Sequence, residues 1–312
     1  MVGPLAEGKK ALIVAGPTAS GKSTLAAAIA REFDGVVINA DAMQVYRELR
    51  VVSARPTPAE EAAVPHRLYG VWPAAEHGTV GKWRAAALAE IAAAHESGKL
   101  PILCGGTGMY LKLIVEGLSP VPPVPPEIRD RARARHAELG ASAFHAELTR
   151  RDPVAGAKLS PNDTQRVLRA WEVVEAHGAA LSDFHAASPL EDANWPTLLL
   201  DPPRDLLGER IDTRVDGMIA AGAIDEVRAL LSQSLPDTLP AMRALGVPEL
   251  AAHIRGEYDL PSAINALKAS TRQFAKRQRT WFRNQLKAAT RFDTQFSESL
   301  LPEIRMFIRK MG

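Results

Sequence analysis

The sequence predicts an α/β fold whose parallel sheet core is interrupted by a helical insertion. Short apolar runs alternate with longer helix-like segments over the first 119 residues, a pattern typical of parallel strands joined by helices. A proline-rich stretch at 119–126 then breaks this pattern, because proline fixes φ and lacks the amide donor. We expect a first core part at 1–119, an insertion at 120–195 and a second core part at 196–312.

The elements follow from apolar periodicity and from the flanking turn residues. Each expected strand is a short apolar run, and together they lie at 10–15, 36–40, 68–72, 101–104 and 197–201. The expected helices of the core lie at 22–33, at 83–97, from Pro202-Pro203 to Met218, and at 261–287. From 127 to about 189 the sequence is helical in texture and poor in strands.

Composition excludes some classes of protein. The chain has 312 residues, 46% hydrophobic residues and a net charge of +2, which is ordinary for a globular protein. The single cysteine, Cys104, excludes an intrachain disulfide, and there is neither a long apolar run nor a signal-like start. We therefore expect a cytoplasmic monomer that does not enter a membrane. The charge is too small to indicate nucleic-acid binding by itself.

A phosphate-binding loop lies between the first strand and the first helix. Gly16, Pro17, Thr18, Ala19, Ser20, Gly21, Lys22 and Ser23 match G-x-x-x-x-G-K-[ST] without a mismatch. Backbone amides and the helix N-terminus would surround a diphosphate, Lys22 would add a full charge and Ser23 could ligate Mg²⁺. The loop predicts a P-loop NTPase-like core. A nucleoside triphosphate and a prenyl diphosphate would both satisfy it.

Two further strand ends carry candidate reactive groups. Asp41 follows the strand at 36–40, where it could associate with Mg²⁺, act as a general base or cap a helix. Thr107 lies among Gly105, Gly106 and Gly108 at the end of another strand. Glycines there would let the hydroxyl and the backbone approach a ligand closely.

The predicted helix at 261–287 carries a cationic stripe. Its members recur at spacings of three and four and are Lys268, Arg272, Lys276, Arg279 and Arg283. No acidic residue interrupts 268–283, so the stripe lacks the carboxylates that usually compensate a solvated basic face. We expect it to face a phosphate backbone.

The insertion carries further cations. Gln165, Arg166 and Arg169 lie on a predicted helix that Asn162 or Asp163 could cap. The linker is followed by four arginines at alternate positions, Arg129, Arg131, Arg133 and Arg135.

These blocks resemble the tRNA dimethylallyltransferases, also called tRNA isopentenyltransferases, over nearly the whole chain. The resemblance rests on motifs in a fixed order, at 16–23, 41–46, 53–56, 65–68, 105–110, 162–170, 243–246 and 276–283. The phosphate loop is shared with many enzymes. The last block, Lys276-Arg277-Gln278-Arg279-Thr280-Trp281-Phe282-Arg283, is distinctive when it occurs together with the other motifs. Ala42, Arg67 and Val247 stand where the family usually has a serine, a second histidine and an aromatic residue.

The resemblance implies an activity and a set of site residues. Dimethylallyl diphosphate would sit on residues 16–23 and Arg214, with Lys22 and Mg²⁺ assisting departure of diphosphate. Asp41 would be the general base toward the exocyclic amine of the adenosine 3′ to the anticodon, and Thr107 would steady the reacting groups. The tRNA anticodon stem-loop would contact several short segments: Asp41, Ala42, Met43, Gln44, Thr107, Arg129, Gln165, Arg166, Val167, Leu168, Arg169, Arg243, Ala244, Leu245, Gly246, Val247 and residues 276–283.

Two rival functions remain open at this point. The loop and Asp41 also suit a small-molecule or nucleotide kinase, although a kinase leaves the basic helix unexplained. A non-catalytic RNA-binding ATPase is the second rival. ATP turnover without RNA would indicate the kinase, and ATP turnover linked to RNA release without base modification would indicate the ATPase.

Overall fold

The computed structural model describes residues 10–119, 121–186, 195–286 and 288–310. Pro120 of the predicted linker, residues 187–194 at the predicted end of the insertion, and Lys287 lie outside the described residues. The chain divides into two compact units. The first unit is formed by Met1–Val115 with Asp192–Gly312, and the second by Glu116–Glu191.

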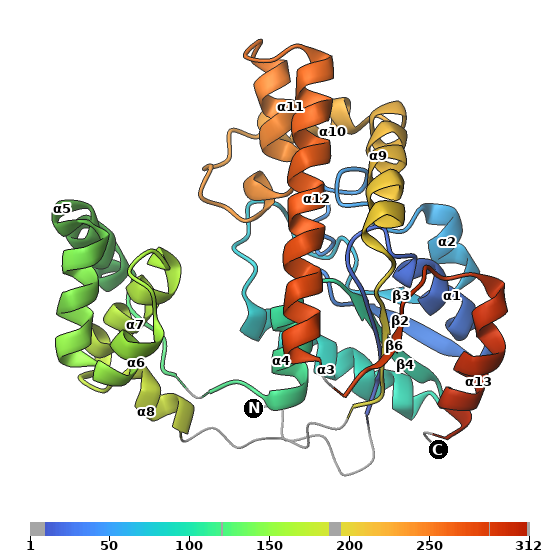
Figure 1. Cartoon of the computed structure of the whole chain (residues 1–312), viewed down its shortest axis with the longest axis horizontal. Helices are drawn as coiled ribbons and strands as arrows, with labels where there is room; N and C mark the ends of the chain where they lie inside the picture. The colour runs from blue at the N-terminus through green and yellow to red at the C-terminus, as the bar shows by residue number, and fades with distance from the viewer. Residues whose placement is uncertain (1–9, 120, 187–194, 287, 311–312) are drawn as a thin grey trace. The chain divides into compact units, whose positions relative to one another are not determined.

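The first unit is built on a parallel sheet of six strands (Figure 1). The strand order is β3-β2-β4-β1-β5-β6, and every pairing among the described strands is parallel. The strands are β1 (Leu12–Ala15), β2 (Gly35–Asn39), β3 (His66–Arg67), β4 (Leu100–Gly105), β5 (Thr197–Leu200) and β6 (Thr290–Phe292). Parallel pairing brings all their carboxyl ends to one edge, where the site of an open α/β sheet lies. The predicted α/β class is confirmed.

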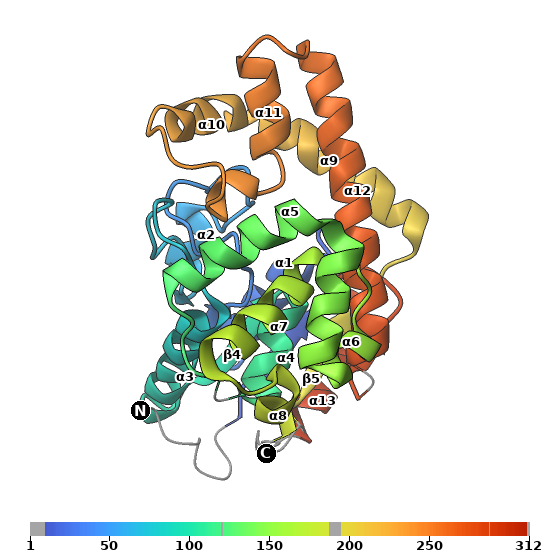
Figure 2. The same cartoon turned by 90° about the vertical axis from the view of Figure 1, so that its left-hand side faces the viewer.

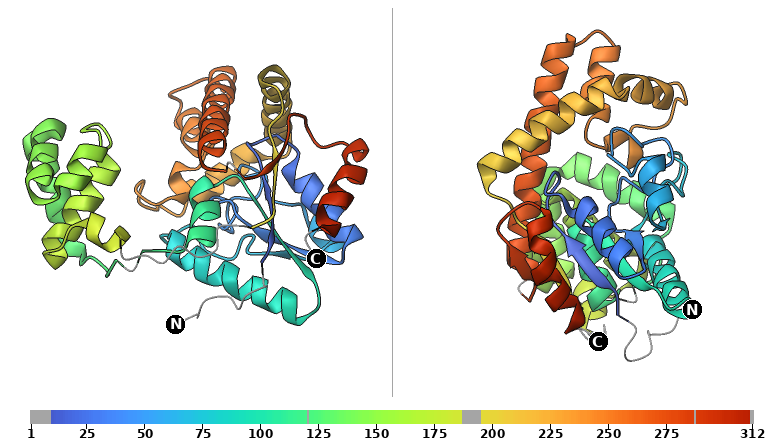
Figure 3. Two further views of the ribbon diagram at one scale, coloured as in Figure 1. Left: turned by 60° about the horizontal axis from the view of Figure 1, so that its bottom comes forward. Right: turned by 90° about the vertical axis from the view of Figure 1, so that its right-hand side faces the viewer.

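Helices cover both faces of the sheet, because successive strand residues point to opposite sides. Leu12 and Val14 of β1 pack with α1 (Lys22–Glu32) and α13 (Leu301–Arg309). Ala11 and Ile13 pack on the other face with α3 (Val80–Glu96) and α4 (Gly108–Glu116). Figure 3 shows the two sets of helices on opposite sides of the sheet. Burial on both faces explains why the strands are uninterrupted apolar runs.

The strand predicted at 68–72 is wrong, since the observed strand ends before that range begins. The structure places β3 at His66–Arg67, paired with Val37 and Ile38 of β2. Leu68 and Gly70 both adopt positive φ, +63° and +60°, so the extended chain ends before Leu68. Trp72 contributes only an isolated bridge to Tyr46.

The remaining helices of this unit extend the core beyond the strand ends. They are α2 (Pro58–Ala63), α9 (Arg204–Ala220), α10 (Ala223–Leu231), α11 (Val247–Ile254) and α12 (Leu260–Gln285), with 3-10 turns η1 (Ala241–Arg243) and η2 (Glu298–Leu300). The long helix α12 contacts α9 and α11, and Figure 1 shows these helices together above the sheet. Asp259 caps α12 by accepting from the Ser262 amide at 2.8 Å.

The second unit is wholly helical over its described residues (Figure 2). Its helices are α5 (Pro126–Arg151), α6 (Pro153–Lys158), α7 (Thr164–His177) and α8 (Leu181–Ala186). Phe144, Leu148 and Trp171 form its small core with Ala132, Val167 and Ala170. Gly140, at φ +75°, kinks α5 so that its two halves can both pack on α7.

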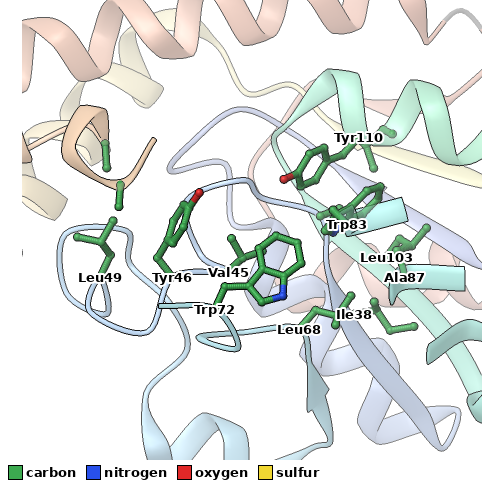
Figure 4. Packing of buried hydrophobic residues seen from close by; sticks show 14 of the residues in the cluster. Ile38, Val45, Tyr46, Leu49, Leu68, Trp72, Trp83, Ala87, Leu103 and Tyr110 are labelled. Atoms are coloured by element: carbon green, nitrogen blue, oxygen red, sulfur yellow. The ribbon is translucent and has the colours of Figure 1, made fainter. Parts of the chain in front are cut away.

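An aromatic cluster supports the chain that follows β2 (Figure 4). The Trp83 indole stacks on Tyr110 with ring centroids 4.1 Å apart, and its Nε1–H donates to the Asn39 carbonyl at 2.8 Å. Tyr46 and Trp72 are buried in the same cluster. The aromatic cluster thus holds the carboxyl end of β2 in place through the bond from Trp83 to Asn39. Within the described residues, no helix is both long and apolar enough to cross a membrane.

Candidate active site

Three segments predicted to carry chemistry meet at the carboxyl edge of the sheet. The phosphate loop follows β1, Asp41 follows β2, and Thr107 follows β4. Because β1 and β2 both pair with β4, the ends of β1 and β2 lie on either side of the end of β4, which carries Thr107. The sheet topology therefore assembles one site from residues far apart in the sequence.

The phosphate loop has the backbone of a preformed anion cradle. Ala19 and Gly21 adopt positive φ, +63° and +90°, and the Ser20 amide donates to the Pro17 carbonyl at 3.3 Å. The start of the loop is tight, since a Cβ on Gly16 would lie 2.5 Å from the Ser20 hydroxyl. That buried hydroxyl has no hydrogen-bond partner among the described residues.

Two cations with depressed pKa values lie at this loop. Burial lowers the pKa of Lys22, and nearby Arg214 lowers it further, while Asp41 acts in the opposite direction. Burial also lowers the pKa of Arg214, whose neighbours are Asp41 and Arg210. Among the described residues Arg214 forms no ion pair within 4.0 Å. A pair of desolvated, mutually repelling cations is stabilised by an anion, which is what a diphosphate would provide.

The Lys22 ammonium donates to the Pro17 carbonyl at 3.2 Å, so the lysine folds back over its own loop. Arg210, which the sequence did not single out, donates from Nε to the Ala19 carbonyl at 2.8 Å. Helix α9 thus supports the loop through Arg210 and supplies Arg214 one turn further on.

Asp41 is held by the residue that ends β2. The buried Asn39 side chain accepts from the Asp41 amide at 2.8 Å and donates to the Asp41 carbonyl at 2.9 Å. One Asp41 carboxylate oxygen, Oδ1, accepts from the Met43 amide at 2.9 Å. No helix begins at Asp41, so the helix-cap interpretation is wrong. The second carboxylate oxygen, Oδ2, accepts no hydrogen bond from the described residues, so it is available to a substrate.

Thr107 is joined to the chain on either side of Asp41. Its Oγ1 accepts from the Ala42 amide at 2.9 Å, and its own amide donates to the Ala40 carbonyl at 3.3 Å. The glycines around it serve packing within the protein. A Cβ on Gly105 would overlap Ala40 at 2.1 Å, and one on Gly108 would lie 2.4 Å from the Trp281 ring. Gly105 and Gly108 therefore allow close contacts with the residue after β2 and with α12, and the approach of a ligand to Thr107 stays a prediction.

The loop after Asp41 is anchored by a carboxylate from α10. Glu226 accepts three backbone amides, those of Arg50, Val51 and Val52, each at 2.8 Å. Gln44 turns inward and donates to the carbonyls of Ser53 and Ala54. The amide nitrogen of Gln44 therefore has partners inside the protein, and the tRNA contact expected of this residue stays a prediction.

We expect Glu226→Gln to lower the free energy of unfolding by about 2 kcal/mol, because the negative charge is lost and the glutamine NH2 group, itself a donor, replaces one of the two acceptor oxygens. Chemical denaturation measures this change directly. Asp225→Asn is the matched control, since Asp225 is exposed and pairs only with Arg228. Equal small losses in the two variants would contradict the anchoring role.

The cationic stripe on α12 is largely compensated, contrary to the sequence-based expectation. Lys268 pairs with Asp216 at 2.7 Å, and Arg272 pairs with Asp212. Arg279 pairs with Asp201 at 2.5 Å, and Arg283 and Arg291 lie 4.0 and 3.6 Å from the same carboxylate. The compensating acids come from α9 and from the end of β5, so local spacing along α12 could not reveal them.

A different face of α12 remains open. A hollow of about 500 Å³ is lined by Gln273, Lys276, Arg277, Thr280, Trp281, Asn284 and Gln285. Lys276 and Arg277 are exposed and form no ion pair with any described residue. An exposed strip with two cations, amides and an indole is suited to phosphates and unstacked bases.

The block at 243–247 is mostly internal. Ala244 and Val247 are 2% and 1% exposed, and a Cβ on Gly246 would lie 2.8 Å from Val52. Arg243 is exposed and donates to the Asp237 carbonyl at 3.1 Å, and Leu245 is half-buried. Of this block, Arg243 has the most accessible side chain.

In the second unit, too, some of the residues predicted to contact tRNA are exposed and others are buried. Gln165, Arg166 and Arg129 are exposed, Arg169 and Leu168 are half-buried, and Val167 is 1% exposed within the core. Asp163 stands at the N-cap position of α7 but makes no capping bond. It pairs instead with Arg166 at 2.9 Å, so the predicted cap is wrong for Asp163.

Cys104 lies beneath the site as a neutral thiol. It is 1% exposed, and burial raises its pKa to about 11, although Lys22 and the Ser23 hydroxyl act in the opposite direction. A thiol in this state is not a nucleophile at neutral pH.

Ser23 and Asp41 supply too few oxygen atoms to hold a magnesium ion alone, so they fit a magnesium ion that also binds the phosphates of a substrate. Ser23 is exposed in the first turn of α1, and Asp41 supplies a carboxylate at the end of β2. No group of three His, Cys, Asp or Glu residues that could hold a metal is found among the described residues. Magnesium binds in this manner where substrate phosphates and water complete its octahedral shell.

Comparisons with known proteins identify the family of this chain. A family model described as IPP transferase matches residues 44–285. A tRNA dimethylallyltransferase of Rhodospirillum centenum is 51% identical over 285 residues, covering 90% of this chain and 91% of its own. One of Rhodospirillum rubrum is 49% identical over 99% of this chain and 97% of its own, a span that includes the phosphate loop and Asp41.

Solved structures show the same fold. The tRNA isopentenylpyrophosphate transferase of Bacillus halodurans superposes with a TM-score of 0.70 at 33% identity, covering 97% of this chain and 96% of its own. A eukaryotic dimethylallyltransferase acting on tRNA superposes with a TM-score of 0.81 at 25% identity, covering 96% of this chain and 77% of its own.

Proposed function

This chain belongs to the IPP transferase family, and we propose that it transfers a dimethylallyl group from dimethylallyl diphosphate to the exocyclic amine of the adenosine 3′ to the anticodon in tRNA. The observation that carries the proposal is that Asp41, at the end of β2, lies close enough to act on the charges of two desolvated cations, Lys22 and Arg214, at the anion cradle after β1. Diphosphate is the other product.

The donor half of the reaction follows from the cradle. When the allylic C–O bond breaks, negative charge develops on the leaving diphosphate. Loop amides, Lys22 and Arg214 are placed to stabilise that charge. Magnesium, held by Ser23 and the diphosphate oxygens, would supply further neutralisation of the leaving group.

The reaction of the acceptor adenosine requires a base that can take a proton from its attacking amine. The adenine amine attacks C1 of the allyl group, the C–O bond to diphosphate breaks, and the amine proton passes to Asp41. Asn39 holds the Asp41 backbone, the Met43 amide donates to the Asp41 carboxylate, and Thr107 fixes the adjoining backbone at Ala42. An adenine in a stacked loop must be flipped out to reach this position.

The tRNA-binding surface is proposed from the exposed residues alone. In the first unit these are Lys276, Arg277 and Thr280 on the open face of α12, together with Arg243, and the half-buried Trp281 adjoins them. In the second unit they are Gln165, Arg166 and Arg129. Splayed single-stranded loops are read by such combinations of cations, amides and aromatic rings.

The direct test combines purified protein, Mg²⁺, labelled dimethylallyl diphosphate and unmodified tRNA that carries an adenosine 3′ to the anticodon. Label should enter tRNA, and mass analysis of its nucleosides should show one dimethylallyl adenosine. A parallel reaction with ATP and small acceptors tests the kinase alternative. Phosphoryl transfer without label transfer would reject the proposal.

The open face of α12 leads to a quantitative prediction. Lys276→Ala with Arg277→Ala should weaken tRNA binding about tenfold and reduce the slope of log K against log salt by about one to two. Binding titrations at several salt concentrations measure both effects. Arg305→Ala with Arg309→Ala removes the same charge from α13 and is the control. Identical slopes in the two double variants would remove α12 from the interface.

A further inference from the structure

One polar side chain on α12 points into the protein instead of toward solvent. Gln278 is 6% exposed, whereas its neighbours Lys276 and Arg277 are exposed. Its Oε1 accepts from the Thr18 amide at 2.9 Å, and its Nε2 donates to the Gly106 carbonyl at 2.8 Å. The sequence-based assignment of Gln278 to tRNA contact is therefore inconsistent with where its side chain lies.

These two bonds join the separate halves of the site. Thr18 belongs to the phosphate loop that would hold the donor. Gly106 adjoins Thr107, which accepts from the amide next to Asp41. A single side-chain amide thus links the diphosphate cradle with the strand end that carries the base.

The amide is closely packed, and its two hydrogen-bond partners set which of its ends faces Thr18 and which faces Gly106. A Cβ on Gly106 would lie 2.3 Å from Gln278 Nε2, and a Cβ on Gly108 would lie 2.4 Å from the Trp281 ring. Helix α12 is further held by the Arg279 pair with Asp201 at the end of β5. The helix, the loop and the glycine turn are therefore docked in one register.

We propose that Gln278 is a positioning residue that fixes the phosphate loop relative to the Asp41 strand end. The inference rests on the proposed prenyl transfer. Its physical basis is that the reacting carbon is placed by the cradle and the amine by the base, so their separation depends on this link. Displacement of reacting groups by about 1 Å is enough to cost on the order of 10²-fold in rate.

Gln278→Ala should lower kcat by on the order of 10²-fold while the tRNA dissociation constant changes by less than about threefold. Gln233→Ala, at an exposed glutamine beyond α10, is the matched control and should change neither. Steady-state kinetics with a separate tRNA titration measures the split. A large loss of tRNA affinity with kcat retained would show that Gln278 is an RNA ligand, and an unchanged kcat would equally overturn the proposal.

Gln278→Glu supplies a test that a merely structural role would not reproduce. Ionised, its carboxylate faces the Gly106 carbonyl and repels it. Protonated, its hydroxyl can donate to Gly106 while its carbonyl accepts from Thr18. Burial favours the protonated form, so the activity ratio of this variant to the native protein should rise as pH falls from 8 to 6. A ratio that stays flat or falls would overturn the proposal.

Affinity for inorganic pyrophosphate separates failure of this inference from failure of the proposed function. Calorimetry should show about tenfold weaker binding to Gln278→Ala than to the native protein, because the cradle is less well organised. This result would support the positioning role of Gln278 even if the native protein transferred no label to tRNA. Equal affinities would count against that role whatever the transfer assay shows.

Discussion

Asp41→Asn is expected to lower kcat by about 10²- to 10⁴-fold, which is the usual contribution of a positioned general base. The asparagine side chain has the same shape and can still accept from the Met43 amide, so the loop should keep its conformation. What is lost is the capacity to take the proton from the attacking amine. Single-turnover label transfer with saturating donor and tRNA measures the effect on the chemical step.

The control is Asp34→Asn, at an exposed aspartate near the amino end of β2 and therefore at the opposite edge of the sheet. It should transfer label at the native rate. The alternative role of Asp41, as a carboxylate associated with Mg²⁺, predicts a different outcome. In that case Asp41→Asn would raise the Mg²⁺ concentration needed for half-maximal activity, and excess Mg²⁺ would restore the rate.

Lys22→Ala should lower kcat by on the order of 10³-fold, because the full positive charge nearest the leaving diphosphate is removed. Pyrophosphate affinity should fall as well, while tRNA binding should be retained because Lys22 is not on the exposed face of α12. Transfer kinetics, pyrophosphate calorimetry and tRNA titration together give the pattern.

Lys99→Ala serves as the control for this substitution. Lys99 pairs with Asp34 beside the amino end of β4, away from the phosphate loop. Loss of tRNA affinity in Lys22→Ala would place the lysine in the RNA interface. Transfer at the native rate would exclude it from the chemistry.

The sequence predicts the core of the fold because its signals are local. Continuous apolar runs locate β1, β2, β4 and β5 to within a residue or two, and a glycine-rich motif between strand and helix identifies the loop. The strand at 68–72 was misplaced because a positive φ at Leu68 is imposed by its surroundings, and leucine gives no sign of it. Strand β6, three residues long, is similarly too short to stand out.

The site is less predictable, because its side chains are satisfied by residues distant in sequence. Asp201 lies 78 positions from Arg279, so the acid that compensates the α12 stripe is invisible to any helical spacing rule. Gln278 recurs at helical spacing with the apolar residues Leu267 and Phe274, and that spacing is the available signal for its burial. Asn39 and Arg210 act through backbone carbonyl and amide groups, which no sequence motif records.

The link between Thr18 and Gln278 spans 260 positions of the chain, which bears on how the protein is made. During synthesis the cradle leaves the ribosome long before the helix that locks it. A nascent chain can form the first strand–loop–helix segment, but its grip on a diphosphate is completed only when α12 docks. Contacts of such long range slow folding, and this one forms only after α12 has been synthesised and has docked.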